Sequence, residues 1–70
     1  MTYSKKYGNY GIYTDGMLYK WFKNLENAMD YWNNDIVPDP ETTEEWLEAY
    51  DSVKLINMKT GELIEVIGEI

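Results

Sequence analysis

The dipeptide Asp15-Gly16 lies between two short runs that are rich in aromatic and branched residues. A two-residue type I′ turn needs a positive φ at both central positions, so Asp-Gly in this setting is the strongest short-range signal for a β-hairpin. Such a turn would place Tyr10 opposite Trp21 on the neighbouring strand. The sequence therefore predicts an aromatic hairpin over residues 7–22.

Two helices are predicted in the middle of the chain. Asn24 is a suitable N-cap for a helix over residues 25–34, in which apolar residues recur at i, i+3, i+4 and i+7. Asp39, which is followed by a proline, is a suitable N-cap for a second helix over residues 40–51.

The boundaries and buried sides of these helices follow from single residues. Asn33 and Asn34 favour an end to the first helix, and the link 36–38 is expected to be extended because the residue before proline avoids helical geometry. The buried stripe of the second helix is expected to comprise Trp46, Leu47 and Tyr50.

The segment Lys59-Thr60-Gly61 predicts the turn of a second hairpin over residues 52–67, with Gly61 in the left-handed conformation. Strict alternation places Val53, Leu55, Leu63 and Ile67 on one face, and Ile56, Ile64 and Val66 on the other. We expect one α+β domain over residues 1–70, with element order ββααββ and an antiparallel sheet of two hairpins packed against two short helices.

Residue types that are missing from the chain exclude most catalytic chemistry. The 70 residues contain no Cys and no His. Disulfide frameworks, zinc fingers, iron–sulfur clusters, Cys or His nucleophiles and imidazole bases are therefore excluded. Ser4 and Ser52 have no histidine to activate them, and Pro38 and Pro40 interrupt any calcium loop of the EF-hand kind. The prediction is a protein that is not an enzyme and has no cofactor and no metal site.

We also expect a cytoplasmic protein from the sequence. No apolar run approaches the roughly 20 residues that span a bilayer, and the first residues lack the apolar stretch of a secretory signal. Absence of cysteine fits a reducing compartment.

Charge is divided unevenly along the chain, whose net charge is -7. Residues 1–23 carry four lysines and one aspartate, a balance of +3, whereas residues 24–51 carry nine acidic residues and no basic residue. Acidic residues of the second predicted helix recur at i, i+3, i+4 and i+7 and share one helix face: Glu41, Glu44, Glu45 and Glu48.

This spacing has two interpretations. An ordinary solvated helix face is one, but a helix built for stability alone would alternate Glu with Lys at i, i+4, a gain of roughly 0.2–0.5 kcal/mol per pair. Here these pairs carry like charges. The second interpretation is an acidic surface that binds a basic surface of another protein and repels nucleic acid and membranes. Its predicted residues are the four glutamates together with Asp39 and Asp51.

Aromatic residues of the first hairpin are predicted to take part as anchors. A sheet that is covered by helices on one side buries only one face, and exposed Tyr and Trp residues anchor protein interfaces. The predicted anchors are Tyr10, Tyr13, Tyr19 and Trp21; cross-strand packing explains those that lie on the buried face.

Two alternatives stay open from the sequence. Aromatic residues interleaved with Lys5, Lys6, Lys20 and Lys23 are typical of a stacking platform for single-stranded nucleic acid, although the net charge of -7 and the lack of Arg oppose this. The other is a self-associating structural protein, such as a homodimer, in which the basic end of one molecule meets the acidic end of the next.

The overall composition of the chain is distinctive: it is short and acidic, has many aromatic residues, and lacks Cys, His and Arg. It resembles that of small phage and mobile-element proteins that inhibit host defence, such as anti-CRISPR and anti-restriction proteins, some of which imitate DNA. The resemblance covers the whole chain as a profile and matches no residue motif. It implies a stoichiometric inhibitor that acts in the host cytoplasm on a nucleic-acid-processing enzyme.

Overall fold

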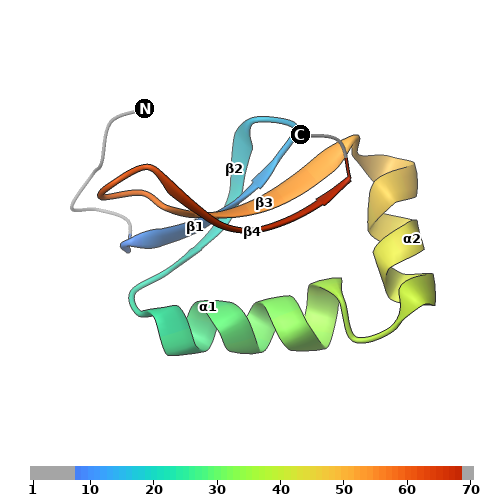
Figure 1. The fold of residues 1–70 in the computed structure, drawn as a ribbon, viewed down its shortest axis with the longest axis horizontal. Coiled ribbons are helices and arrows are strands. Elements are labelled where there is room, and N and C mark those ends of the chain that lie inside the picture. The colour runs from blue at the N-terminus through green and yellow to red at the C-terminus, as the bar shows by residue number, and fades with distance from the viewer. Residues whose placement is uncertain (1–7, 69–70) are drawn as a thin grey trace.

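The computed structural model describes residues 8–68. β1 (Tyr10–Thr14), β2 (Met17–Phe22), β3 (Ser52–Asn57) and β4 (Glu62–Gly68) form one antiparallel sheet in the order β2-β1-β3-β4. The two hairpins therefore lie side by side, with β1 and β3 in the centre and β2 and β4 at the edges (Figure 1). The predicted α+β class and the order ββααββ are confirmed. The hairpin predicted over residues 7–22 starts at residue 7, which lies outside the described residues.

The turn between β1 and β2 has the predicted conformation. Asp15 has φ 51° and Gly16 has φ 86°, so both central residues have the positive φ that a type I′ turn needs. The Asp15 carboxylate also accepts hydrogen bonds from the backbone N–H groups of Asp51 and Ser52, at 2.9 and 3.1 Å. The turn is thereby tied to the start of β3.

β2 contains a bulge that the sequence did not predict. Ile12 pairs with Lys20 and Tyr13 pairs with Leu18, so Tyr19 is an extra residue on β2. The predicted pairing of Tyr10 with Trp21 is therefore wrong: Tyr10 pairs with Phe22 and Gly11 pairs with Trp21. A bulge sends two neighbouring side chains to the same side of a sheet. Beyond it, Phe22 lies on the side of the helices and Trp21 on the other side.

The first helix runs further than predicted. α1 (Leu25–Tyr31) continues without a break into one wider π-helical segment, η1 (Trp32–Ile36), which ends with a hydrogen bond from the Val37 N–H to the Trp32 carbonyl at 3.0 Å. Asn33 and Asn34 do not end the helix. The predicted extended link is wrong at Ile36, which is helical, and at Val37, whose φ of -128° and ψ of 38° are not extended. Continuation of the helix buries both Trp32 and Ile36 in the core, which explains the difference. The predicted cap is confirmed, since the Asn24 side chain accepts a hydrogen bond from the Asn27 N–H at 2.9 Å.

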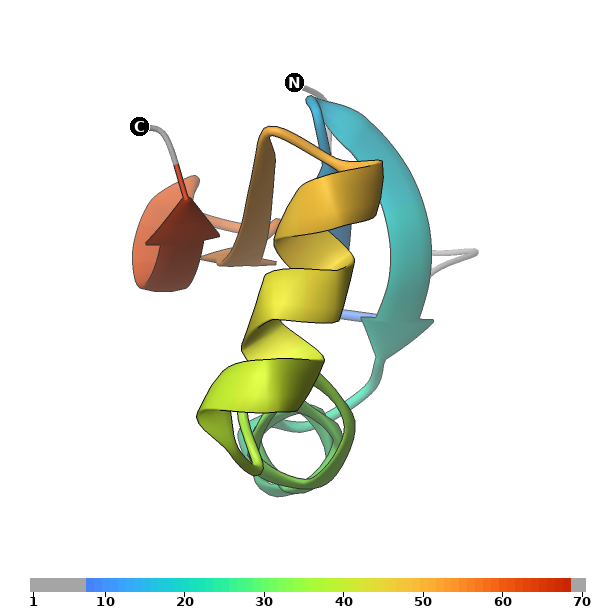
Figure 2. The ribbon, with the colours of Figure 1, turned by 90° about the vertical axis from the view of Figure 1, so that its right-hand side faces the viewer.

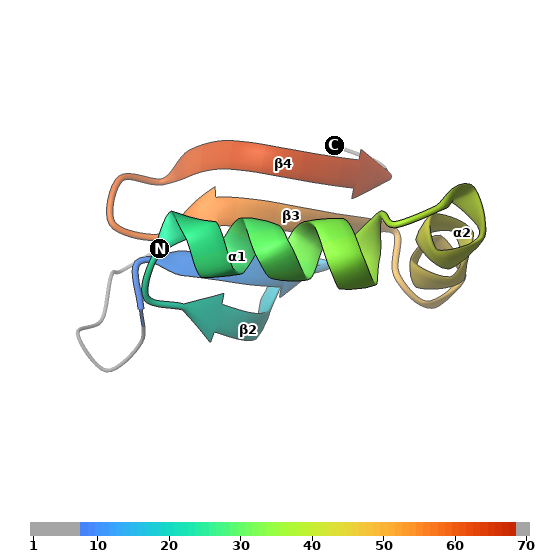
Figure 3. The ribbon, with the colours of Figure 1, turned by 90° about the horizontal axis from the view of Figure 1, so that it is seen from below.

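α2 (Pro40–Ala49) ends two residues before the predicted boundary. It begins as predicted, with Asp39 as N-cap. α1 and η1 lie along one face of the sheet, whereas α2 stands across one end of it (Figures 2 and 3). No helix within residues 8–68 is long and apolar enough to cross a bilayer.

The core lies between the sheet and the helices on one face. Ile12 of β1 and Val53 and Leu55 of β3 are fully buried against helix residues Ala28, Trp32 and Ile36. A second bulge, in β4, leaves Ile64 as an extra residue and corrects the predicted face assignment of the second hairpin. Ile64 packs on the core, whereas Leu63 pairs with Ile56 on the opposite face.

Candidate functional site

The acidic surface, which we define as the four glutamates of α2, is fully presented to solvent. All four side chains are exposed: Glu41, Glu44, Glu45 and Glu48. The three predicted apolar residues are less accessible, since Trp46 and Leu47 of α2 and Tyr50 at its C-cap are half-buried. None of these three is fully buried, so the predicted stripe is a contact at the edge of the core and not a part of its centre.

Three sets of hydrogen bonds hold α2 in place. The Asp39 carboxylate accepts from the Thr42 N–H at 2.8 Å. The Thr43 hydroxyl lies 3.3 Å from the Ile36 carbonyl and 3.2 Å from the Asp39 carbonyl, to either of which it can donate. The Trp46 indole Nε1–H donates to the Asp35 carbonyl at 2.8 Å. The helix is thus fixed at its start and in its middle to the segment that precedes it.

The other two predicted acidic residues flank α2 in different roles. Asp39 is exposed, but one of its carboxylate oxygens is engaged as the helix cap. Asp51 is exposed directly after the helix, and its backbone N–H donates to Asp15. Asp39 therefore precedes the acidic surface in the sequence, and Asp51 follows the C-cap of its helix.

The four predicted aromatic anchors do not form one surface. Tyr10 is half-buried against the core on the helix side. Tyr13 is only 8% exposed and lies on the opposite face, where Trp21 is 39% exposed. Tyr19 is 49% exposed and lies against α2. Of the four, Tyr19 alone adjoins the acidic surface.

The bulge in β2 places Tyr19 next to α2. Tyr19 contacts Trp46, with ring centroids 5.4 Å apart and planes at 83°, and Tyr50, with centroids 6.5 Å apart. Trp46 and Tyr50 are stacked at 6.0 Å. The sequence did not predict this cluster, because α2 and β2 meet only through the tertiary fold. The spacing of Trp46 and Tyr50, one helical turn apart, was the only sequence signal.

Lys20, the neighbour of Tyr19 at the bulge, is directed to a second pair of rings. Its Nζ lies 5.7 Å from the Phe22 ring centroid and 5.5 Å from that of Tyr31, within the range of a cation–π interaction. Burial, the neighbouring Tyr19 hydroxyl and the Asp35 carboxylate raise the pKa of Tyr31 to about 12.

The alternative of a stacking platform for single-stranded nucleic acid needs several aromatic rings on one face. Phe22 and Trp21 lie on opposite sides of the sheet, which does not favour a single stacking platform. Lys5 and Lys6 of that alternative lie outside the described residues.

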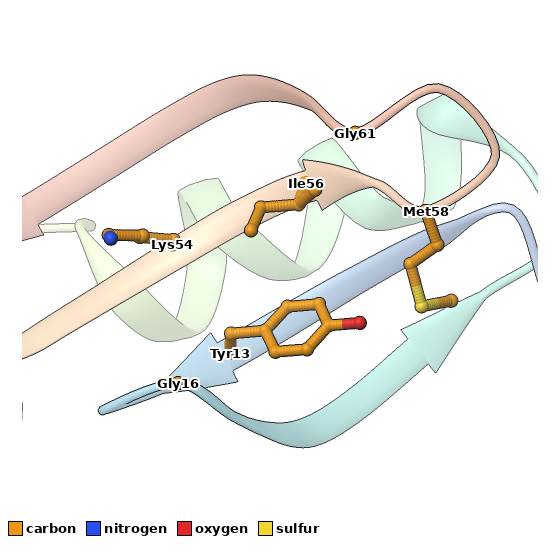
Figure 4. A pocket seen from close by; sticks show the side chains of 6 residues that line it. All are labelled: Tyr13, Gly16, Lys54, Ile56, Met58 and Gly61. Carbon is orange, nitrogen blue, oxygen red and sulfur yellow. The ribbon is translucent and has the colours of Figure 1, made fainter. Parts of the chain in front are cut away.

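The face of the sheet turned away from α1 carries a hollow of about 380 Å³. Side chains of Tyr13, Lys54, Ile56 and Met58 line it together with Gly16 and Gly61, and α1 passes behind the strands (Figure 4). Gly11 of β1 lies close to one of these side chains, since a Cβ atom there would come within 2.7 Å of the Met58 Sδ. Burial raises the pKa of the Tyr13 hydroxyl above its ordinary value. This hollow could not be predicted from the sequence, in which apolar residues on both faces of the second hairpin were the one related signal.

A metal site finds no support in the described part of the chain. Within residues 8–68 no group of three carboxylates is placed to hold a metal ion. Comparison of the chain with protein-family models, with curated proteins and with solved structures found no match. No relative therefore supplies a function for either surface.

Proposed function

We propose that this protein is a non-enzymatic binding module that docks the acidic surface of α2 on a basic surface of another protein. The observation that supports the proposal is the exposure of all four glutamates on one helix, in a stretch of nine acidic residues without a base. An unbalanced field of this kind accelerates encounter with a basic partner and disfavours wrong partners.

The hydrogen bonds that hold α2 in place fit the role of a binding surface. The cap at Asp39, the Thr43 hydroxyl and the Trp46 indole fix the helix to η1 and to the link after it. A surface that is already ordered before binding loses less conformational entropy when the partner arrives. The glutamate carboxylates are therefore presented on a rigid support.

Inhibition is the consequence that we propose for this docking. Where the basic surface of a partner normally holds nucleic acid, the carboxylates of α2 would stand roughly where phosphates stand. Occupation of that surface requires no chemistry and is stoichiometric. This agrees with the resemblance to anti-defence proteins of phages, for which the partner would be a nucleic-acid-processing enzyme in the host cytoplasm.

The test is affinity capture from a bacterial lysate with three immobilised proteins. These are the wild type, an acidic-surface variant and a control variant in which four other acidic residues are neutralised, so that both variants have the same net charge. The acidic-surface variant carries E41Q, E44Q, E45Q and E48Q; the control variant carries E26Q, D30N, E62Q and E65Q.

We expect a protein that binds the wild type and the control variant, is lost from the acidic-surface variant and elutes as salt is raised. Equal retention by both variants contradicts the proposal, because binding would then not depend on the α2 glutamates in particular. Circular dichroism of both variants checks that they are folded.

The two alternatives stay predictions with direct tests. Sedimentation over a concentration series detects a homodimer or a longer assembly. Titration with single-stranded oligonucleotides at low salt detects a stacking platform through a change in tryptophan fluorescence.

A further inference from the structure

A hollow on the surface lies where β2 meets α2. It has a volume of about 290 Å³ and is lined by Tyr19, Glu45, Trp46, Ala49 and Tyr50. We call it the aromatic hollow. Its three rings come from two elements that the fold brings together, and its one carboxylate belongs to the acidic surface.

The rings are close enough to act on one ligand group. Their centroids are separated by 5.4, 6.5 and 6.0 Å, and the Tyr19 ring stands nearly perpendicular to that of Trp46. Because Trp46 and Tyr50 are stacked and Tyr19 meets them edge-on, one cation cannot face all three rings. It can lie over the face of one ring, within about 6 Å of that centroid, which is the range of a cation–π interaction. The exposed Glu45 carboxylate at the rim adds an opposite charge.

We infer that the aromatic hollow binds the guanidinium group of an arginine side chain that the partner presents. The inference rests on the proposed function, because it names the group that anchors a basic surface against α2. Arginine fits better than lysine for two reasons: its planar guanidinium stacks on aromatic rings and is weakly hydrated, and its fork pairs with a carboxylate through two hydrogen bonds.

A guanidinium group has to come from another molecule. The chain contains no arginine. Lys20, the lysine next to Tyr19, lies over the rings of Phe22 and Tyr31 and not over the aromatic hollow. Residues 24–51, which supply α2 and most of the lining, contain no basic residue.

The probe for the test is the peptide acetyl-Gly-Arg-Gly-amide, titrated into the ¹⁵N-labelled protein at low salt. The matched control peptide carries citrulline, which has the shape of arginine without its charge. We expect saturable chemical-shift changes that are concentrated at the Trp46 indole N–H and at the backbone of Tyr19 and Tyr50. The citrulline peptide should bind at least about five-fold more weakly, because it forms neither the cation–π interaction nor the ion pair.

Two variants test the lining directly. E45Q and Y19L should each weaken binding of the arginine peptide about 2–5-fold, the loss that corresponds to one ring or one exposed ion pair. E62Q, which removes the same charge from β4, should leave binding within experimental error of the wild type. Spectral dispersion shows whether each variant is folded; if Y19L is not, the citrulline peptide and E45Q decide.

Three results would overturn the inference. These are equal binding of the citrulline peptide, shifts spread over the whole acidic surface, and tighter binding of a trimethyllysine peptide than of the arginine peptide. Its failure is distinguishable from failure of the proposed function. If only the inference fails, the arginine peptide does not bind the aromatic hollow, but capture still depends on the α2 glutamates. If the proposed function fails, capture does not depend on those glutamates, whether or not the peptide binds.

Discussion

Replacement of Glu48 by lysine should stabilise the protein while it weakens docking. Glu48 is exposed in the last turn of α2, one helical turn after the exposed Glu44, and that last turn contains no basic residue. Glu48→Lys removes a like-charge i,i+4 pair and creates an attractive one, each worth about 0.2–0.5 kcal/mol. It also places a cation beside the negative end of the helix dipole, worth about 0.3–1 kcal/mol.

These effects together raise the free energy of unfolding by about 1 kcal/mol. For a domain of this size, that corresponds to an increase in melting temperature of about 4–8 °C. Glu48→Gln is the matched variant: it removes the repulsion without adding the attraction, so we expect less than half of the gain. Urea and thermal unfolding followed by circular dichroism measure both variants against the wild type.

Salt provides the control for this reasoning. At about 1 M salt the Debye length falls to about 3 Å, so most of the gain from an exposed pair should disappear. A lysine variant no more stable than the glutamine variant, or a gain that high salt leaves unchanged, would refute the electrostatic explanation. If the lysine variant is more stable as expected, then the wild-type helix is less stable than it could be because of its glutamates. This is the cost expected of a functional acidic surface.

Three further changes test other parts of the structure. Asp39→Ala should lower the free energy of unfolding by about 1 kcal/mol and Asp39→Asn by much less, because asparagine still caps α2; equal losses in urea unfolding would argue against the cap. Asp15→Ala should destabilise by about 1–3 kcal/mol through loss of two hydrogen bonds and of a residue that tolerates positive φ, whereas Asp15→Asn retains most of both; chemical denaturation that ranks the two variants equally would contradict this. Because the folded-state pKa of Tyr31 is raised to about 12 from 10.0, the unfolded chain loses this proton first, so stability should fall between about pH 10 and 12; Tyr31→Phe should reduce that slope in thermal melts, and an unchanged slope would rule the residue out.

The parts of the fold that local chemistry determines could be predicted from the sequence. Asp15-Gly16 allows few conformations other than a tight hairpin turn, and Asp39 before a proline allows few positions for a helix start. The four glutamates share a helix face by spacing alone, so the acidic surface needed only that the helix form. These predictions depend on neighbours in sequence, which the sequence shows directly.

The register of β2 could not be predicted for the opposite reason. Residues 17–22 are apolar or amphipathic at nearly every position, so either face can be buried and the pattern does not fix the register. Packing decides it: the bulge lets Tyr19 reach Trp46 while Phe22 reaches Tyr31. The aromatic hollow depends on that bulge, which is why it escaped prediction together with the register.

The π-helical segment at Trp32–Ile36 has a similar cause. Local preference favours an end at the asparagines, but burial of Trp32 and Ile36 outweighs it. Burial of two large side chains is worth several kcal/mol, more than the preference of single residues for a helix end. The sequence of one segment shows its local preference for a helix end but not the tertiary burial that outweighs it.

Both bulges lie on the two edge strands, whereas the pairing of β1 with β3 in the centre is regular. An edge strand offers unpaired backbone groups to any passing strand, and regular edges promote aggregation. At Tyr19 on one edge and Ile64 on the other, an incoming strand meets a kink where the ladder of donors and acceptors loses its repeat. β4 is an apolar edge strand with an exposed Leu63, so it could promote aggregation in a concentrated solution. The same irregularity that positions Tyr19 thus also limits the growth of the sheet from one molecule into the next.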